Sequence, residues 1–231
     1  MISNEKLVLQ DNERLDDLQY NNLYIIQNKT KYCFTSDAVL LANFVKAKKS
    51  DIVVDFCSGS GIVGILVYAK NNCKKMHLVE IQSSFCDMAN RTIRFNGLQD
   101  KIDVHQLKVQ DAVNEFGHGS VDVVVCNPPY KVAENHNVTE KQEIAMCKYE
   151  LFLSLDELIS SASKILKFGG KFYFVHQSNR ITEIILTLKK YGMEAKKMEF
   201  CYPAQKSLSN VVLVEAVKGA KSGVLVTKTT N

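Results

Sequence analysis

Short apolar runs alternate with stretches of helical periodicity through the middle of the chain. The apolar runs predict buried strands at 52–56, 76–80, 102–105, 121–126 and 171–176. Apolar residues at helical spacing predict helices at 61–70, 83–95, 150–167 and 181–191. The third of these helices should end at Gly169-Gly170, since glycine commonly follows a helix C-terminus. Strands separated by helices pair in parallel, so the pattern predicts a doubly wound α/β sheet.

The last two predicted strands, 197–202 and 211–217, have no helix between them. A direct return of the chain makes such a pair antiparallel. The predicted fold class is therefore α/β, with a mostly parallel seven-stranded sheet and an antiparallel last strand. That combination is typical of the Rossmann-like class I methyltransferase fold.

The start of the chain has a different pattern. Residues 15–34 look extended, and residues 36–47 look helical with Ser36 or Asp37 as the N-cap. We interpret residues 1–35 as an appendage that flanks the active site and residues 36–231 as the main domain. A polar stretch at 131–148 separates the fourth strand from the following helix.

Composition favours one buried core. The chain has 231 residues, of which 46% are hydrophobic and 23% charged. Its first residues have no apolar leader, and no window has the apolar length of a membrane span, so we expect a cytoplasmic, monomeric protein without a membrane partner. The seven cysteines form no Cys-x-x-Cys pair. They predict buried reduced thiols and no metal site.

The charge of the chain is mildly positive, with a formal net charge of +4 and a pI of about 8.6. Residues 201–231 contain four lysines against one glutamate. A basic segment suits a polyanionic partner such as nucleic acid, and an ordinary solvated surface explains it equally well.

A glycine-rich turn follows the first predicted strand. The segment from Asp55 to Gly64 contains Gly59, Gly61 and Gly64 in a Gly-x-Gly-x-x-Gly arrangement that lets a ligand approach the backbone at a helix N-terminus. Glu80 ends the next strand, where its two carboxylate oxygens could accept from two ribose hydroxyls. These features also describe a nicotinamide dinucleotide site, so the glycines alone leave the cofactor open.

The fourth strand ends in Asn127-Pro128-Pro129-Tyr130. Proline has no N–H and a fixed φ, so the turn is stiff and leaves carbonyl oxygens free to accept hydrogen bonds. The Asn127 amide adds an acceptor, and Tyr130 adds a flat ring on which a planar group can stack. The motif resembles that of methyltransferases that modify exocyclic amines of nucleobases or a glutamine amide.

Two carboxylates complete a wider resemblance. Asp55 precedes the first glycine, and Asp111 follows the third strand, where a carboxylate could accept from an adenine amino group. With the Asn-Pro-Pro-Tyr turn, these features resemble class I S-adenosylmethionine methyltransferases. Segments 34–42 and 218–221 are similar to the bacterial tRNA1(Val) adenine-37 N6-methyltransferase family. Residues 148–150 read Lys-Tyr-Glu where that family usually has Arg-His-Glu.

The resemblance implies a function and a set of site residues. It implies methyl transfer from S-adenosylmethionine to N6 of an adenine in tRNA, namely adenine 37 of a valine tRNA, by a methyltransferase domain at 36–231. The expected cofactor contacts are Phe34, Thr35, Asp55, Ser58, Gly59, Gly61, Glu80, Ile81, Asp111, Ala112 and Asn127. The expected catalytic residues are Asn127, Pro128, Pro129 and Tyr130. The expected RNA contacts are Tyr130, Lys206, Lys218 and Lys221.

Three alternatives stay open at this level. The same acceptors could hold the N2 amine of a guanine in ribosomal RNA, or the side-chain amide of a protein glutamine. The third is a catalytically silent nucleic-acid-binding module. The intact Asp55, glycine, Glu80 and Asn-Pro-Pro-Tyr set argues against the silent module.

Overall fold

The structure, a computed structural model, describes residues 7–31, 33–130, 152–202 and 208–230. Its main feature is an eight-stranded sheet in the order β10-β8-β9-β7-β6-β3-β4-β5. The strands are β3 (Ile52–Phe56), β4 (Lys75–Glu80), β5 (Ile102–Gln106), β6 (Val121–Cys126), β7 (Leu166–Gln177), β8 (Met193–Tyr202), β9 (Val211–Lys218) and β10 (Leu225–Thr230). Adjacent strands in the run β7-β6-β3-β4-β5 pair in parallel, which confirms the predicted fold class.

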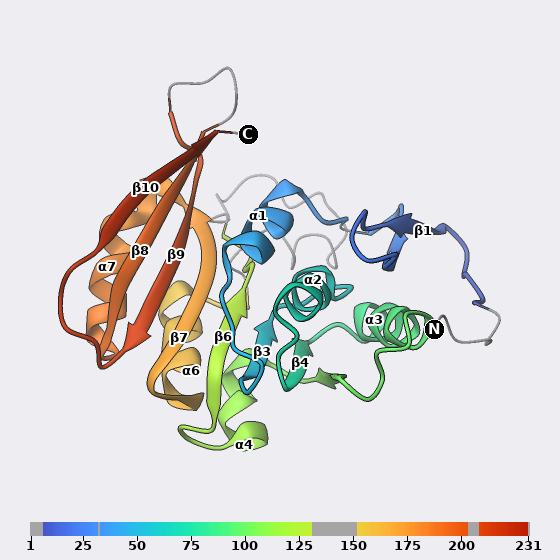
Figure 1. The fold of residues 1–231 in the computed structure, drawn as a ribbon, viewed down its shortest axis with the longest axis horizontal. Coiled ribbons are helices and arrows are strands. Elements are labelled where there is room, and N and C mark those ends of the chain that lie inside the picture. The colour runs from blue at the N-terminus through green and yellow to red at the C-terminus, as the bar shows by residue number, and fades with distance from the viewer. Residues whose placement is uncertain (1–6, 32, 131–151, 203–207, 231) are drawn as a thin grey trace.

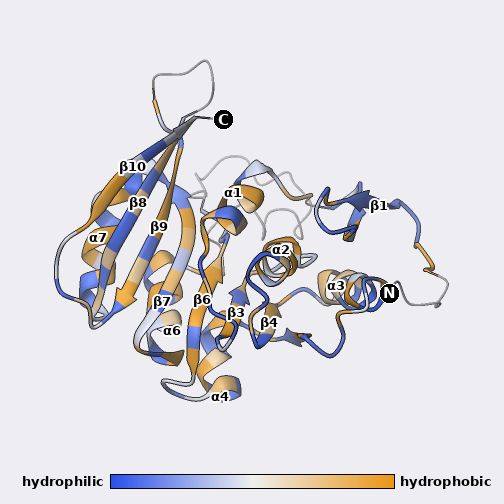
Figure 2. Ribbon diagram, viewed as in Figure 1, coloured by the Kyte–Doolittle hydropathy of each residue, from blue (hydrophilic) through white to orange (hydrophobic). Residues whose placement is uncertain are grey.

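Helices cover both faces of this sheet (Figure 1). One face carries α1 (Ser36–Phe44), α2 (Ile62–Asn71) and α3 (Ser83–Phe95). The other face carries α4 (Ala112–Phe116), α6 (Leu155–Ile165) and α7 (Ile181–Lys190). Short 3₁₀ turns at Val109–Asp111 and Ser178–Arg180 precede α4 and α7. The central strands are apolar along their length, as expected for strands buried on both faces (Figure 2).

The predicted antiparallel pair is confirmed, and the sheet extends beyond it. β9 lies between β7 and β8 and is antiparallel to both. The added strand is β10, which pairs in parallel with β8 at the edge of the sheet. The sequence predicted residues 225–230 only as part of a basic segment. The sheet therefore has eight strands rather than the predicted seven.

The start of β7 corrects one predicted helix end. The helix α6 begins after Ser154, whose side chain forms a capping box with Glu157, and it ends at Ile165. Leu166 already pairs with Val121 of β6, so the chain is part of the sheet there. Gly170 lies inside β7, where a Cβ would come within 2.9 Å of a backbone oxygen, so glycine suits this position.

The N-terminal residues form a separate two-stranded antiparallel sheet of β1 (Glu13–Asp17) and β2 (Tyr24–Asn28). This hairpin packs on α3, where Ile26 of β2 contacts Phe85 and Met88. Arg91 of α3 binds Glu13 of β1 at 2.6 Å. The hairpin is therefore attached to the main domain through α3.

The cap predicted for the first helix is wrong. The N-cap of α1 is Thr35, and its side chain makes no capping hydrogen bond. The Asp37 side chain instead accepts a hydrogen bond from the Tyr130 hydroxyl. Among the described residues, no helix has both the length and the apolar character needed to cross a bilayer.

Candidate active site

The glycine-rich turn connects β3 to α2 through a left-handed backbone. Cys57, Gly59 and Gly61 have φ values of 55°, 55° and 96°. The turn is held by the Gly61 N–H, which donates to Ser58 O at 2.9 Å, and by the Ser58 N–H, which donates to Val79 O on β4 at 3.1 Å. The N-terminus of α2 therefore opens at the end of β3, with Gly61 as its N-cap.

Gly64 allows α2 to lie close against the sheet. A Cβ at this position would come within 2.2 Å of the Leu78 side chain on β4. The Gly64 N–H donates to Asp55 Oδ2 at 2.8 Å. Close packing of helix on strand thus explains the third glycine of the motif.

Glu80 shapes the turn as well as facing the pocket. Its Oε2 accepts from the Gly59 N–H at 2.9 Å, and its Oε1 accepts from the N–H groups of Ile81 and Gln82 at 3.0 and 2.9 Å. A carboxylate offers about four acceptor positions, so three are already in use. Among the described residues, the unused acceptor position lies on Oε2. The binding of ribose hydroxyls by Glu80 stays a prediction.

Asp55 is buried beneath the turn. Burial raises the pKa of its carboxyl group to about 8, the Gly64 N–H opposes that rise, and the nearby Glu80 charge adds to it. Its Oδ1 has no hydrogen-bond partner among the described residues, and neither does the buried Ser58 hydroxyl. Buried polar atoms of this kind mark a place where a bound polar ligand can supply the missing partner.

The Asn-Pro-Pro-Tyr turn follows β6, the neighbour of β3 on the other side from β4. Asn127 and Pro129 face the pocket. The Tyr130 hydroxyl donates to Asp37 Oδ2 at 2.7 Å, which ties the end of the turn to α1. Its ring centroid lies 5.9 Å from that of His176 on β7.

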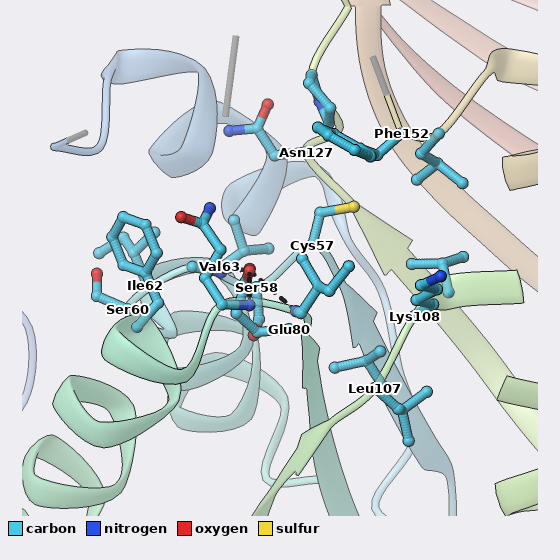
Figure 3. Close-up of a pocket in the computed structure, with 18 of the residues that line it drawn as sticks. Cys57, Ser58, Ser60, Ile62, Val63, Glu80, Leu107, Lys108, Asn127 and Phe152 are labelled. Atoms are coloured by element: carbon cyan, nitrogen blue, oxygen red, sulfur yellow. Dashed lines mark hydrogen bonds between the residues drawn. The ribbon is translucent and has the colours of Figure 1, made fainter. Parts of the chain in front are cut away.

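These segments surround one pocket at the carboxyl ends of β6, β3, β4 and β5, with about 950 Å³ of empty space including its open mouth. Figure 3 shows Asn127 and Phe152 on one side of it and Glu80, Leu107 and Lys108 around the rest. The crevice lies between β3 and β6, where the strand order reverses, which is the usual ligand position in doubly wound sheets. The lining residues are Phe34, Cys57, Ser58, Gly59, Ser60, Ile62, Val63, Val79, Glu80, Ile81, Gln82, Phe85, Leu107, Lys108, Val109, Gln110, Asn127, Pro129, Phe152 and Leu153.

Several predicted site residues do not line this pocket, namely Thr35, Asp55, Gly61, Asp111, Ala112, Pro128 and Tyr130. Of these, Asp55, Gly61, Ala112 and Pro128 are buried. Asp111 is exposed at the start of α4, and the preceding Gln110 lines the pocket in its place. The reason is the 3₁₀ turn at 109–111, which directs neighbouring side chains to different sides.

Other pocket contacts were missed by the sequence analysis. Gln27 of β2 is buried, donates to the Ser60 hydroxyl at 2.8 Å and accepts from the Phe34 N–H at 3.2 Å. Gln110 donates to Phe152 O at 2.9 Å and so joins two pocket segments. The contacts of Gln27 depend on folding of the hairpin, so no local sequence signal marks them.

Two of the lysines predicted to bind RNA lie away from the pocket. Because β9 is antiparallel to β7, Lys218 lies near the amino ends of the parallel strands, opposite the pocket. Its ammonium donates to the backbone oxygens of Ser163 and Leu166 and so holds the end of α6. Lys221 follows at the same end of the strands and is exposed. A contact of these lysines with RNA stays a prediction. Lys206, the 131–148 stretch and residues 148–150 lie outside the described residues.

Comparison with known proteins gives a consistent result. Residues 35–200 match the "Methyltransferase small domain" family. The chain is similar to a tRNA1(Val) (adenine(37)-N6)-methyltransferase of Dyadobacter fermentans, with 23% identity over 71% of this chain and 68% of the relative. A Cytophaga hutchinsonii protein of the same name is 22% identical over 84% of this chain and 81% of the relative. A predicted O-methyltransferase of Agrobacterium tumefaciens has the same fold, with a TM-score of 0.64, 21% identity, and coverage of 84% of this chain and 86% of the other.

Proposed function

The chain belongs to the methyltransferase small domain family, and from that premise we propose that it methylates the exocyclic N6 of an adenine in tRNA, with S-adenosylmethionine as methyl donor. The main support for the proposal is that the glycine turn, Glu80 and the Asn-Pro-Pro-Tyr turn line the same pocket. Glu80 and the glycine turn line one side of it, and Asn127 and Pro129 line another. The names of the relatives support tRNA as the substrate and adenine 37 of a valine tRNA as the target base.

The pocket fits the proposed methyl donor. The Ser58 hydroxyl lines the pocket and has no hydrogen-bond partner among the described residues, so it suits the polar amino-acid end of that molecule. The remaining acceptor position of Glu80 suits a ribose hydroxyl. Apolar Leu107, Val109 and Leu153 suit the flat face of an adenine.

S-adenosylmethionine would supply the methyl group as a sulfonium electrophile. The chain's own contribution is to hold the acceptor amine. The Asn127 side-chain oxygen and the Pro128 carbonyl would accept from the N6 hydrogens, which aims the nitrogen lone pair and lowers its delocalisation into the ring. Such orientation can lower a barrier by roughly 7–11 kcal/mol, so the chemistry needs no strong base.

Tyr130 provides the ring for stacking the target base, and its hydroxyl contact with Asp37 fixes the direction of that ring. A base in the single-stranded anticodon loop is easier to extrude than a paired one. Among the described cations, Lys108 is exposed at the pocket and is the one we assign to a nearby phosphate. We also propose that the protein acts on tRNA in the cytoplasm. The hairpin at 13–28 is part of the proposed appendage of residues 1–35 beside the site.

The test is methyl incorporation into separate tRNA, ribosomal RNA and release-factor substrates, followed by nucleoside analysis. We expect N6-methyladenosine in a valine tRNA. Asn127→Ala should lower the rate at least a hundredfold with the cofactor affinity nearly unchanged, whereas Asn114→Ala, at an exposed position on α4, should not change the rate. Label found only in protein, or as N2-methylguanosine, would overturn the proposed substrate.

A further inference from the structure

A cluster of imidazole and carboxylate groups lies outside the pocket, on the strand pair β4 and β5. His77 of β4 is directly opposite Asp103 of β5, and Val79 is opposite His105. Side chains two residues apart on a strand share a face, so all three polar groups project from the same face of the sheet. One ligand atom from each of His77, Asp103 and His105 lies within 4.8 Å of the other two.

The spacing of these atoms fits a small divalent ion. His77 Nδ1 is 3.0 Å from His105 Nε2 and 3.7 Å from Asp103 Oδ2. Ligand atoms of a tetrahedral zinc ion with bonds near 2.0–2.1 Å lie about 3.3 Å apart. The observed separations bracket that value, so an ion could enter with small side-chain rotations.

The neighbours of the cluster orient its ligand atoms. His105 Nδ1 lies 2.9 Å from Glu115 Oε1, and this contact places a proton on Nδ1 and turns the Nε2 lone pair toward His77. Lys75 binds Asp103 Oδ1 at 2.8 Å, so Oδ2 is the oxygen nearer His77. A carboxylate behind a ligating histidine is the usual second contact at zinc sites.

An aromatic ring holds the two imidazoles in place. The Phe116 ring packs 5.3 Å from the His77 ring and 5.2 Å from the His105 ring, measured between centroids. The side chains of His77 and His105 remain 17% and 18% exposed, which leaves a path for an ion.

We propose that His77, Asp103 and His105 form a binding site for a divalent transition-metal ion of the zinc type, with water completing its coordination. The ion would link the edge strand β5 to β4. Because β5 continues directly into residues 107–110, such a link would also steady one wall of the pocket. The prediction of no metal rested on cysteine spacing, and these ligands come from two separate strands.

The test is a zinc titration of untagged, metal-stripped protein by calorimetry, with a competing chelator. We expect one saturable zinc per chain and slower amide exchange in β5 when zinc is present. His77→Asn and His105→Asn should each raise the zinc Kd at least tenfold. Glu115→Gln should raise it roughly tenfold, because loss of such a second contact typically weakens binding 10- to 100-fold.

The matched control is His118→Asn, an exposed histidine just after α4, which should leave the zinc Kd unchanged. Glu115 is also well exposed, so its variant should stay folded even if a histidine variant does not. The competing arrangement is a plain hydrogen bond with a proton between His77 and His105. Absence of saturable zinc binding would overturn the metal site and leave the hydrogen bond as the explanation. Equal zinc affinity of the His105→Asn and wild-type proteins would do the same.

Discussion

At the scale of single residues, two buried carboxylates at neighbouring strand ends have different surroundings. Burial raises the pKa of both Asp55 and Glu80. Glu80 accepts three backbone N–H groups that favour its charged form, whereas Asp55 accepts one, and its Oδ1 has no partner in the part of the chain that the structure describes. The charged form of Asp55 therefore has fewer hydrogen bonds to support it than the charged form of Glu80.

This difference predicts a pH-dependent stability. Because the pKa of Asp55 is 3.8 when unfolded and about 8 when folded, the unfolded chain binds fewer protons between these values. The free energy of unfolding should fall as the pH rises through that window, by at most about 1.4 kcal/mol per pH unit. Urea unfolding at pH 5, 6 and 7 should show this decline in the wild-type protein.

The control is Asp55→Asn, which keeps an oxygen to accept from the Gly64 N–H and cannot ionise. Its stability should exceed that of the wild type by a margin that grows from pH 5 to pH 7. A constant difference between the two proteins would contradict the assignment of a neutral Asp55.

At the scale of elements, the contact of α2 with β4 depends on Gly64. Gly64→Ala places a Cβ within 2.2 Å of Leu78 and forces the helix away from the sheet. Overpacking of this kind typically costs about 1–3 kcal/mol. We expect Gly64→Ala to lower the free energy of unfolding by that amount, and it should also weaken the hydrogen bond to Asp55.

Gly59→Ala is the matched comparison, since nothing lies within 4 Å of a Cβ there and only its φ of +55° opposes the change. That backbone cost is roughly 1 kcal/mol. Urea unfolding of both variants at one pH measures the difference. If Gly59→Ala were the more destabilising, close packing would not be the reason for the third glycine.

Among the elements, local patterns predicted the strands from 52 to 126 and the helices α2, α3 and α7 within a few residues. Two of the errors fall where long-range pairing decides. Leu166 belongs to β7 because β6 offers it a partner, and residues 225–230 form a strand because β8 is available at the sheet edge. A capping box at Ser154 and Glu157 was present in the sequence and would have placed the start of α6.

At the scale of the whole molecule, the two ends of the parallel strands differ. The pocket lies at their carboxyl ends, and Lys218 stabilises the structure near their amino ends. Lys218→Met should lower the free energy of unfolding by about 1.5–3 kcal/mol, the range for hydrogen bonds to a charged group. It should leave the affinity for tRNA unchanged, because its ammonium is directed at the end of α6.

Lys221→Met serves as the control, since that side chain is exposed at the same end of the strands as Lys218. It should change neither the free energy of unfolding nor the affinity for tRNA. Urea unfolding and filter binding of tRNA measure the two effects. A loss of tRNA affinity with unchanged stability in Lys218→Met would support the phosphate role that the sequence analysis gave this residue.

The sequence by itself determined the order of the elements from β3 to β9, the glycine turn and the Asn-Pro-Pro-Tyr turn, because these follow from local periodicity and local backbone preference. Only the tertiary structure decided which acceptor of Glu80 stays free, that Gln27 reaches Ser60, that Lys218 points away from the pocket, and that His77 faces His105. Each of those contacts joins residues far apart in the chain, and their distances depend on strand register and helix packing that no local pattern specifies.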